Sequence, residues 1–136
     1  MLNTETVLLI VEDNGAVRAL AAAALGEKHF SILQACDAAE ALKLIGPHGR
    51  IDFLLTDVDL GAGPNGIELA SRVVTEHPGV RVLLMSGLGE SEDAAAREGF
   101  PFLAKPFTPA SLSQRVEEVL ATPAEIRLAA RSAQAS

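Results

Sequence analysis

The strongest constraint on the fold of this 136-residue chain is the alternation of short apolar runs with longer segments of helical spacing. Val7–Val11 is apolar throughout, as expected for a strand that is buried on both faces of a sheet. Asn14 to Leu25 follows with its apolar residues on one helical face, and Gly26 predicts the end of that helix. The pattern then repeats four times. The further strands are expected at 30–35, 52–57, 80–85 and 102–104, and the further helices at 37–45, 65–77, 90–98 and 108–120.

Five alternations of strand and helix predict a parallel sheet with helices on both faces, because a parallel crossover needs a long connection and is right-handed. We therefore expect a doubly wound, three-layer α/β/α domain over residues 1–120. Residues 121–136 are expected to be a tail that either adds a short helix or frays. Gly46-Pro47 is expected to close the second helix, and Thr108-Pro109 to cap the last one.

Charge and composition exclude several classes of protein. Eighteen acidic against eleven basic residues give a net charge of −7, which argues against a nucleic-acid-binding surface and against a polybasic membrane patch. No apolar run approaches the roughly 18 residues of a membrane span. The one cysteine, Cys36, has no partner for an internal disulfide, so a cytoplasmic location is expected. Cys36 itself is expected to be a small buried side chain.

Polar side chains follow four of the five predicted strands, at the edge where such sheets bind ligands. In the strand order 2-1-3-4-5 the first and third strands are neighbours, so Glu12, Asp13 and Asp57 are expected to converge. Three carboxylates at 4 Å repel by about 4 kcal/mol per pair at an effective dielectric near 20, so the cluster requires protonation or a cation. Oxygen ligands favour Mg²⁺, or Mn²⁺, over zinc.

Two further strand-end residues extend this chemistry. Lys105 supplies a fixed positive charge after the fifth strand, and Ser86 supplies a hydroxyl donor after the fourth. A dication, an ammonium and a hydroxyl around one carboxylate form a receptor for a phosphoryl group. Asp57 is the expected oxygen nucleophile, which would form an aspartyl phosphate.

In their order and positions, these motifs resemble the receiver domain of two-component response regulators, and in particular receivers associated with hybrid histidine kinases of alphaproteobacterial type. The resemblance covers about residues 5–120 and implies a flavodoxin-like fold with strand order 2-1-3-4-5. The motifs that carry it are Glu12-Asp13, Thr56-Asp57-Val58-Asp59-Leu60, Ser86-Gly87 and Lys105-Pro106-Phe107.

The resemblance implies a metal site and a phosphoacceptor. Asp57 is then the phosphoacceptor and, with Asp13, a direct ligand of Mg²⁺. Glu12 acts through water, and the backbone carbonyl of Asp59 completes the protein ligands. Lys105 pairs with the phosphoryl oxygens.

The resemblance also implies a switch and a set of partners. Ser86 is the switch hydroxyl, Phe102 stands at the position of a rotating aromatic residue, and the Lys105-Pro106 bond is expected to be cis. The expected donor is a histidine kinase or a histidine phosphotransfer protein, and the expected output is a changed contact with a downstream protein. Apart from self-catalysed phosphotransfer and autodephosphorylation, no enzymatic turnover is expected, and no nucleic acid or membrane partner.

Three alternatives stay open on the sequence. A degenerate receiver would serve as a phosphorylation-independent binding module. Asp57-Val58-Asp59 also resembles the first motif of haloacid-dehalogenase-like phosphatases, which release phosphate catalytically. The glycine-rich segment Gly61–Gly66 fits a dinucleotide fingerprint, although the neighbouring acids would repel a pyrophosphate. Relative to the receiver pattern, Gly61 replaces the usual proline, and the short segment after Ser86 predicts an abbreviated or irregular fourth helix.

Overall fold

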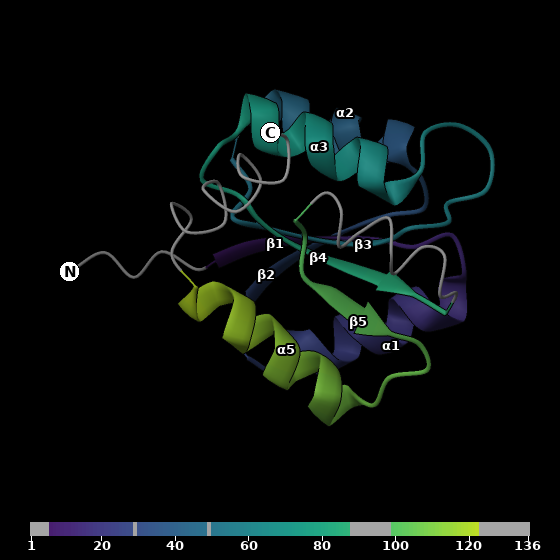
Figure 1. Cartoon of the computed structure of the whole chain (residues 1–136), viewed down its shortest axis with the longest axis vertical. Helices are drawn as coiled ribbons and strands as arrows, with labels where there is room; N and C mark the ends of the chain where they lie inside the picture. The colour runs from purple at the N-terminus through teal and green to yellow at the C-terminus, as the bar shows by residue number, and fades with distance from the viewer. Residues whose placement is uncertain (1–5, 29, 49, 88–98, 123–136) are drawn as a thin grey trace.

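A five-stranded parallel sheet lies between two layers of helices (Figure 1). The computed structural model describes residues 6–28, 30–48, 50–87 and 99–122. The strand order is β2-β1-β3-β4-β5, which confirms the predicted doubly wound fold. The helix expected at 90–98 and the tail after residue 122 lie outside the described residues. The strands are β1 (Thr6–Val11), β2 (Phe30–Ala35), β3 (Phe53–Asp57), β4 (Arg81–Ser86) and β5 (Phe102–Ala104), and the helices are α1 (Gly15–Gly26), α2 (Ala38–His48), α3 (Gly66–Glu76) and α5 (Pro109–Ala121).

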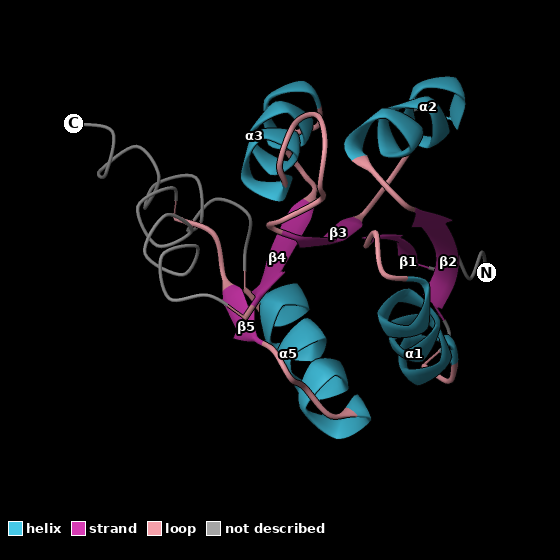
Figure 2. Ribbon diagram, turned by 90° about the vertical axis from the view of Figure 1, so that its right-hand side faces the viewer, coloured by secondary structure: helices cyan, strands magenta, loops and turns pink. Residues whose placement is uncertain are grey.

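Helices α1 and α5 cover one face of the sheet, and α2 and α3 cover the other (Figure 2). The side chains of β1 alternate between the two cores: Leu8 and Ile10 pack with α1 and α5, whereas Leu9 and Val11 pack with α2 and α3. All four are fully buried. Burial on both faces explains why this strand is apolar at consecutive positions rather than at alternate ones. None of the described helices is both long and apolar enough to span a bilayer.

The order of the strands creates a switch point at β1. This strand pairs with β2 on one side and with β3 on the other, so Val11 lies opposite both Ala35 and Thr56. The residues that follow, Glu12 after β1 and Asp57 at the end of β3, therefore leave adjacent strands at the same edge of the sheet.

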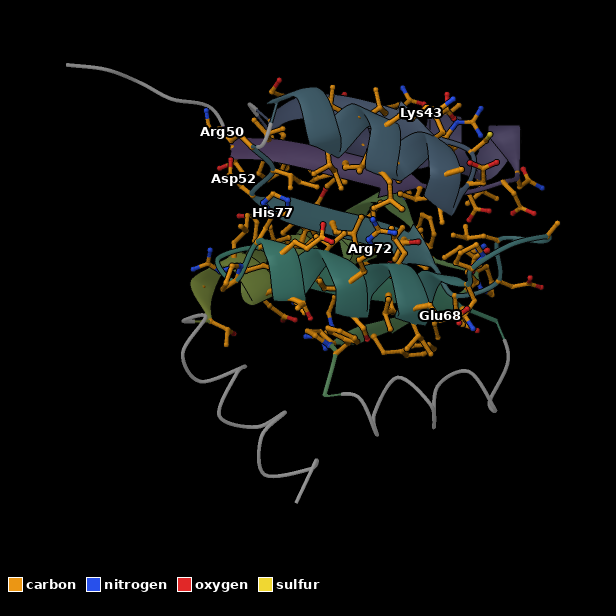
Figure 3. All side chains as sticks on the ribbon, turned by 90° about the horizontal axis from the view of Figure 1, so that it is seen from above. Lys43, Arg50, Asp52, Glu68, Arg72 and His77 are labelled. Atoms are coloured by element: carbon orange, nitrogen blue, oxygen red, sulfur yellow. The ribbon has the colours of Figure 1, made fainter. Side chains whose placement is uncertain are left out.

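Local capping interactions fix where the helices begin. The side chain of Thr108 accepts a hydrogen bond from the Ser111 N–H at 3.0 Å, and Pro109 is the first residue of α5, as predicted. At the start of α3, Asn65 and Glu68 form a reciprocal capping box. Figure 3 shows Glu68 at one end of α3 and His77 at the other. The Glu68 end follows the loop after β3 and so faces the edge where β1 and β3 end.

Two expectations from the sequence are wrong. Helix α2 continues through Gly46-Pro47 to His48 instead of ending near residue 45. Gly46 favours this, because a residue without Cβ removes one of the two clashes between a helical residue and the ring of a following proline. Cys36 is exposed rather than buried. It follows the edge strand β2, and its backbone N–H donates to Glu40 Oε1 at 2.7 Å in the turn that leads into α2.

Candidate functional site

Three carboxylates meet at the carboxyl ends of β1 and β3. Glu12, Asp13 and Asp57 each offer an oxygen, and these atoms lie within 4.8 Å of one another. Glu12 and Asp57 are buried, whereas Asp13 is exposed. The convergence of these three side chains, predicted from the switch point of the sheet, is therefore confirmed. Asp13 is the one that is open to solvent.

Lys105 joins the two buried carboxylates. Its Nζ lies 2.7 Å from Glu12 Oε1 and 3.1 Å from Asp57 Oδ2. The ammonium compensates part of the negative charge, because an unpaired buried carboxylate is costly. Among the residues of the described cluster, one positive charge faces three negative ones when all are ionised, so the site retains an attraction for a further cation.

Burial and these contacts shift the pKa values of Glu12 and Lys105. Burial raises the pKa of Glu12 above its ordinary value, and the charge of Asp57 adds to this; hydrogen bonds from Lys105 and from the Asn14 backbone oppose it without cancelling it. Burial alone would lower the pKa of Lys105, but its hydrogen bonds to Glu12 and Asp57 outweigh burial and raise that pKa. Lys105 is therefore a cation throughout the physiological range, and Glu12 is ionised less readily than a free carboxyl.

Glu12 is held by groups from β2 and from the first part of α1 with its N-cap. Its backbone N–H donates to the Ala35 carbonyl at 3.1 Å, and its backbone carbonyl accepts from Arg18 Nη1 at 2.8 Å. Its side-chain Oε2 accepts from the Asn14 N–H at 3.1 Å. Sequence reasoning missed both supporting residues. Asn14 carries a recognisable signal, since asparagine before a helix is a preferred N-cap, whereas nothing in the sequence distinguishes Arg18 from a solvated helix residue.

Gly66 is a further residue that the sequence reasoning did not single out. It begins α3 directly against the backbone of Asp57. A Cβ at this position would lie 2.8 Å from the carbonyl carbon of Asp57 and closer still to its oxygen. The Gly66 N–H also donates to the Val58 carbonyl at 2.8 Å. The close approach of helix and strand thus depends on the absence of a side chain at position 66.

Ser86 and Phe102 lie at different positions along the strand direction of the sheet. Ser86 ends β4 and is buried at the same edge as the carboxylates, since Met85 is the residue opposite Asp57. Its backbone carbonyl accepts from the Lys105 N–H at 2.9 Å, which ties the ends of β4 and β5 together. Phe102 lies at the start of β5, is half-buried, and packs against the core beneath α2 and α3. The Lys105-Pro106 bond is cis, as predicted.

The loop after β3 passes beside the exposed carboxylate of Asp13. Asp59 is exposed, and its Oδ1 accepts from the Gly61 N–H at 3.1 Å. Gly61 and Gly63 have φ values of 77° and 89°, a left-handed region that favours glycine. A Cβ on Gly61 would be 3.8 Å from Asp13 Oδ2, so the glycine-rich loop borders the acidic cluster. This position is unfavourable for a pyrophosphate, which weakens the dinucleotide interpretation.

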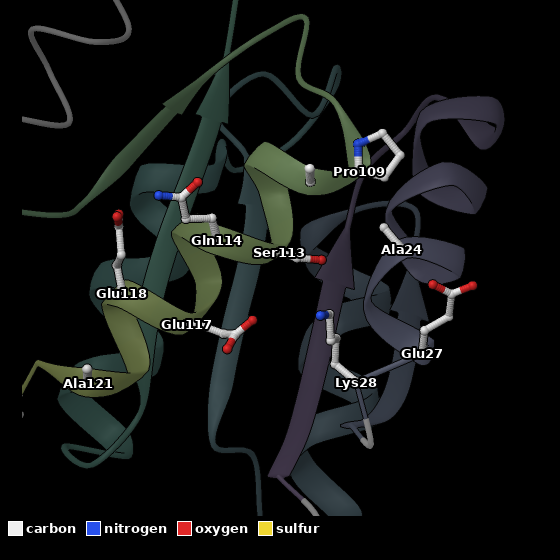
Figure 4. Close-up of a pocket in the computed structure, with 10 residues that line it drawn as sticks. Ala24, Glu27, Lys28, Pro109, Ser113, Gln114, Glu117, Glu118 and Ala121 are labelled. Carbon is white, nitrogen blue, oxygen red and sulfur yellow. The ribbon is translucent and has the colours of Figure 1, made fainter.

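The surface of the described residues is also grooved, both away from the carboxylates and beside them. A groove of about 710 Å³ runs between α1 and α5, with Lys28 and Glu117 among its lining residues (Figure 4). None of its lining residues belongs to the acidic cluster. A smaller groove of about 290 Å³ is mainly apolar and adjoins the site through Lys105 and Phe107. Leu20, on its wall, is 44% exposed.

Known proteins are similar to this chain in both sequence and fold. The sensor kinase CckA of Brucella abortus is 31% identical over 125 residues, which cover 88% of this chain and 13% of that protein. A chemotaxis protein CheY homolog of Campylobacter jejuni is 30% identical over 121 residues, covering 85% of this chain and 92% of that protein. The crystal structure of the receiver domain of NtrX from Brucella abortus has a TM-score of 0.76 at 29% identity, covering 85% of this chain and 98% of that one.

The comparisons agree with the resemblance in the strand-end motifs. A family model described as the response regulator receiver domain matches residues 8–117, which include the acidic cluster, Ser86 and Lys105. The chain spans only a small part of CckA, but nearly the whole length of the CheY homolog. The chain belongs to the response regulator receiver domain family.

Proposed function

We propose that Asp57 accepts a phosphoryl group from a phosphohistidine and that this modification changes the protein contacts of the chain. Receiver domains are signalling modules of two-component systems. The observation that carries the assignment to Asp57 is its buried carboxylate, held 3.1 Å from Lys105 and beside Glu12 and Asp13. A fixed cation next to a carboxylate in an acidic cluster supplies the electrostatic setting that phosphoryl transfer requires.

The residues of the cluster fit a hard divalent cation. The donors are carboxylate oxygens, the attraction for a cation exceeds what Lys105 satisfies, and exposed Asp13 leaves an approach from solvent. Asp13 and Asp57 would hold Mg²⁺ directly, with the backbone carbonyl of Asp59. Glu12 is already engaged by Lys105, which is consistent with a contact through water. A bound Mg²⁺, or Mn²⁺, supplies charge neutralisation for the phosphoryl oxygens.

The covalent step needs no other nucleophile. A carboxylate oxygen of Asp57 attacks phosphorus, the new O–P bond forms as the P–N bond of the phosphohistidine breaks, and the leaving nitrogen keeps the electron pair and takes up a proton. Lys105, already in contact with Asp57, exchanges a carboxylate contact for a phosphoryl oxygen. The donor is the phosphohistidine of a histidine kinase or a histidine phosphotransfer protein.

The switch couples this chemistry to the opposite end of β5. Phosphorylation adds a charge of roughly −1.5 to −2 and three acceptor oxygens. Ser86 gains a partner at the same edge, and Phe102 turns into the space that Ser86 leaves. The face formed by β5 and α5 then shifts its population toward a second packing that a cytoplasmic target protein recognises.

Intact-mass spectrometry after treatment with acetyl phosphate tests the acceptor and the metal together. We expect the wild-type chain to gain one phosphoryl group in the presence of Mg²⁺ and very little in excess EDTA. Asp57→Asn removes the nucleophile and should abolish the gain. The matched control is Asp37→Asn, which also neutralises an acid after a strand at this edge but lies outside the cluster. Equal labelling of the Asp57→Asn variant would refute the assignment.

The same samples separate the receiver from the alternatives. A receiver is modified about once per chain, whereas a haloacid-dehalogenase-like phosphatase would release inorganic phosphate continuously from the donor. A degenerate receiver would gain no phosphoryl group with any divalent cation. Measuring free phosphate against labelled protein over time therefore distinguishes the three.

A further inference from the structure

Arg18 contacts the acidic cluster through the main chain of Glu12. It lies on α1, is partly buried, and donates from Nη1 to the backbone carbonyl of Glu12 at 2.8 Å. Glu12 is completely buried, so its carbonyl depends on a protein partner instead of bulk water. Since the Glu12 N–H is held by Ala35, this contact fixes the other side of the same residue.

The held carbonyl also determines the direction of the next residue. The carbonyl of Glu12 and the N–H of Asp13 belong to one planar peptide group, so orienting the oxygen orients the whole plane. Asp13 is exposed, and packing therefore contributes little to its position. The contact from Arg18 consequently affects the position of the Asp13 carboxylate relative to Asp57. Arg18 is not itself a member of the acidic cluster.

The positive charge of Arg18 also acts on the beginning of α2. The pKa of Glu40 is lowered, first by the hydrogen bond from the Cys36 backbone N–H and in smaller part by the positive charge of Arg18. Arg18 thus contacts the turn after β1 and contributes a positive charge near Glu40. A planar group with fixed donors holds the Glu12 carbonyl in one direction better than the single ammonium of lysine does.

We propose that Arg18 is a positioning residue of the cation site, which holds the Glu12–Asp13 peptide in the orientation that brings the Asp13 and Asp57 carboxylates together. This inference rests on the proposed function, because it assumes that the cluster binds a divalent cation. Its direct consequence is that loss of Arg18 weakens cation binding while Asp57 and Lys105 remain in place.

The sign of the effect separates positioning from simple electrostatics. Arg18 is a positive charge near a cation site, so removing its charge alone would strengthen the binding of a divalent cation. Removing a group that orients a ligand instead weakens metal binding, typically by 10- to 100-fold. A positioning role and a purely electrostatic role therefore predict opposite changes in cation affinity for the same substitution.

Titration of the metal-free protein with Mn²⁺, followed by electron paramagnetic resonance of the free ion, measures this affinity directly. We expect Arg18→Met, which keeps the side-chain length, to weaken Mn²⁺ binding about tenfold. Arg18→Lys keeps the charge but loses the planar fork, and should weaken binding by a smaller factor. The control Arg72→Met removes an exposed arginine on α3 and should leave the affinity unchanged. Unchanged or tighter binding in Arg18→Met would overturn the inference.

A second measurement distinguishes weaker cation binding from loss of the folded protein. Labelling by acetyl phosphate is followed as a function of Mg²⁺ concentration, and far-ultraviolet circular dichroism checks that each variant is folded. We expect Arg18→Met to need about tenfold more Mg²⁺ but to reach the wild-type plateau. A lowered plateau at the same Mg²⁺ midpoint would contradict a positioning role, as would an unshifted curve. If Arg18→Met does not fold, Arg18→Lys decides by the same criteria. Failure of the wild-type chain to be labelled would instead overturn the proposed function.

Discussion

Lys105 Nζ lies 2.7 Å from Oε1 of Glu12, although 93 residues separate them in the chain. The contact joins the turn after β1 to the turn after β5, so it closes the site across β3 and β4, the two strands that lie between them in the sheet. It also means that the same ammonium serves two buried carboxylates, because Asp57 is its second partner. The stability of the metal-free protein and the proposed affinity for cations are therefore coupled through one side chain.

Replacing Lys105 by methionine is expected to destabilise the metal-free protein and to strengthen cation binding. The substitution leaves Glu12 and Asp57 buried without their ion pairs, and breaking a buried pair costs about 3 kcal/mol. Urea denaturation at pH 7 in EDTA measures this loss. Because the variant is more negative at the site, its affinity for Mn²⁺ should rise. Lys43→Met, at an exposed position on α2 (Figure 3), is the control and should change neither quantity; equal stability of the two variants would contradict the model of the site.

Glu12→Gln is expected to alter how stability depends on pH. The pKa of Glu12 is raised in the fold, mainly by burial, from its ordinary value of 4.5. Below pH 4.5 the group is protonated in both the folded and the unfolded chain. As pH rises above this value the unfolded chain ionises first, so the fold loses stability until the raised pKa is passed. The glutamine variant lacks this loss.

The measurement compares unfolding free energies from pH 4 to pH 8 without metal. The difference between Glu12→Gln and wild type should move in favour of the variant as pH rises above 4.5, and then stay constant. Glu117→Gln, an exposed position on α5, serves as the control. A difference that is independent of pH, or that moves in favour of wild type, would show that burial of Glu12 does not control its ionisation.

The sequence was sufficient for features that depend on the order of the elements. The apolar run before Glu12 indicated a strand buried on both faces, and the switch-point rule then brought Glu12 beside Asp57. The same reasoning placed Lys105 at this edge, since it follows the fifth strand. These inferences need only the direction of each strand and its rank in the sheet.

Features that depend on how the elements pack were not predictable. Arg18 has the spacing of an ordinary exposed helix residue, and its contact with the Glu12 carbonyl follows from how α1 sits against the turn before it. Cys36 was expected to be buried because small thiols usually are, but it follows an edge strand that has a neighbour on one side only. Gly66 was recognised as part of a helix start, without its close approach to Asp57.

Gly66→Ala is expected to destabilise the protein and to impair phosphorylation. The new Cβ would collide with the carbonyl group of Asp57, and neither backbone has a flexible end that can yield. We expect a loss of about 2 kcal/mol or more in the free energy of unfolding, as for overpacked cores. Labelling by acetyl phosphate should fall as well, because relief of the clash moves Asp57.

Gly15→Ala is the matched control for this substitution. Gly15 begins α1 as Gly66 begins α3, but a Cβ there would meet only the Nη2 atom of Arg18, at an ordinary 3.8 Å. Alanine favours helices over glycine by up to about 1 kcal/mol, so this variant should be as stable as wild type or more stable. If both variants lose the same stability, the close packing of α3 against Asp57 is not the cause.

The thiol of Cys36 is expected to be accessible but slow to react. It is exposed, and its pKa is raised, first by its hydrogen bond to Glu40 and further by slight desolvation and by the charge of Asp37. Since the thiolate is the reactive form, a raised pKa lowers the reaction rate at neutral pH. Ellman's reagent should therefore modify one thiol per folded chain, more slowly than it modifies the denatured chain at the same pH. Glu40→Gln should accelerate the reaction, whereas Glu76→Gln, far along α3, should not. A thiol that reacts only after unfolding would show that Cys36 is buried, as the sequence alone had suggested.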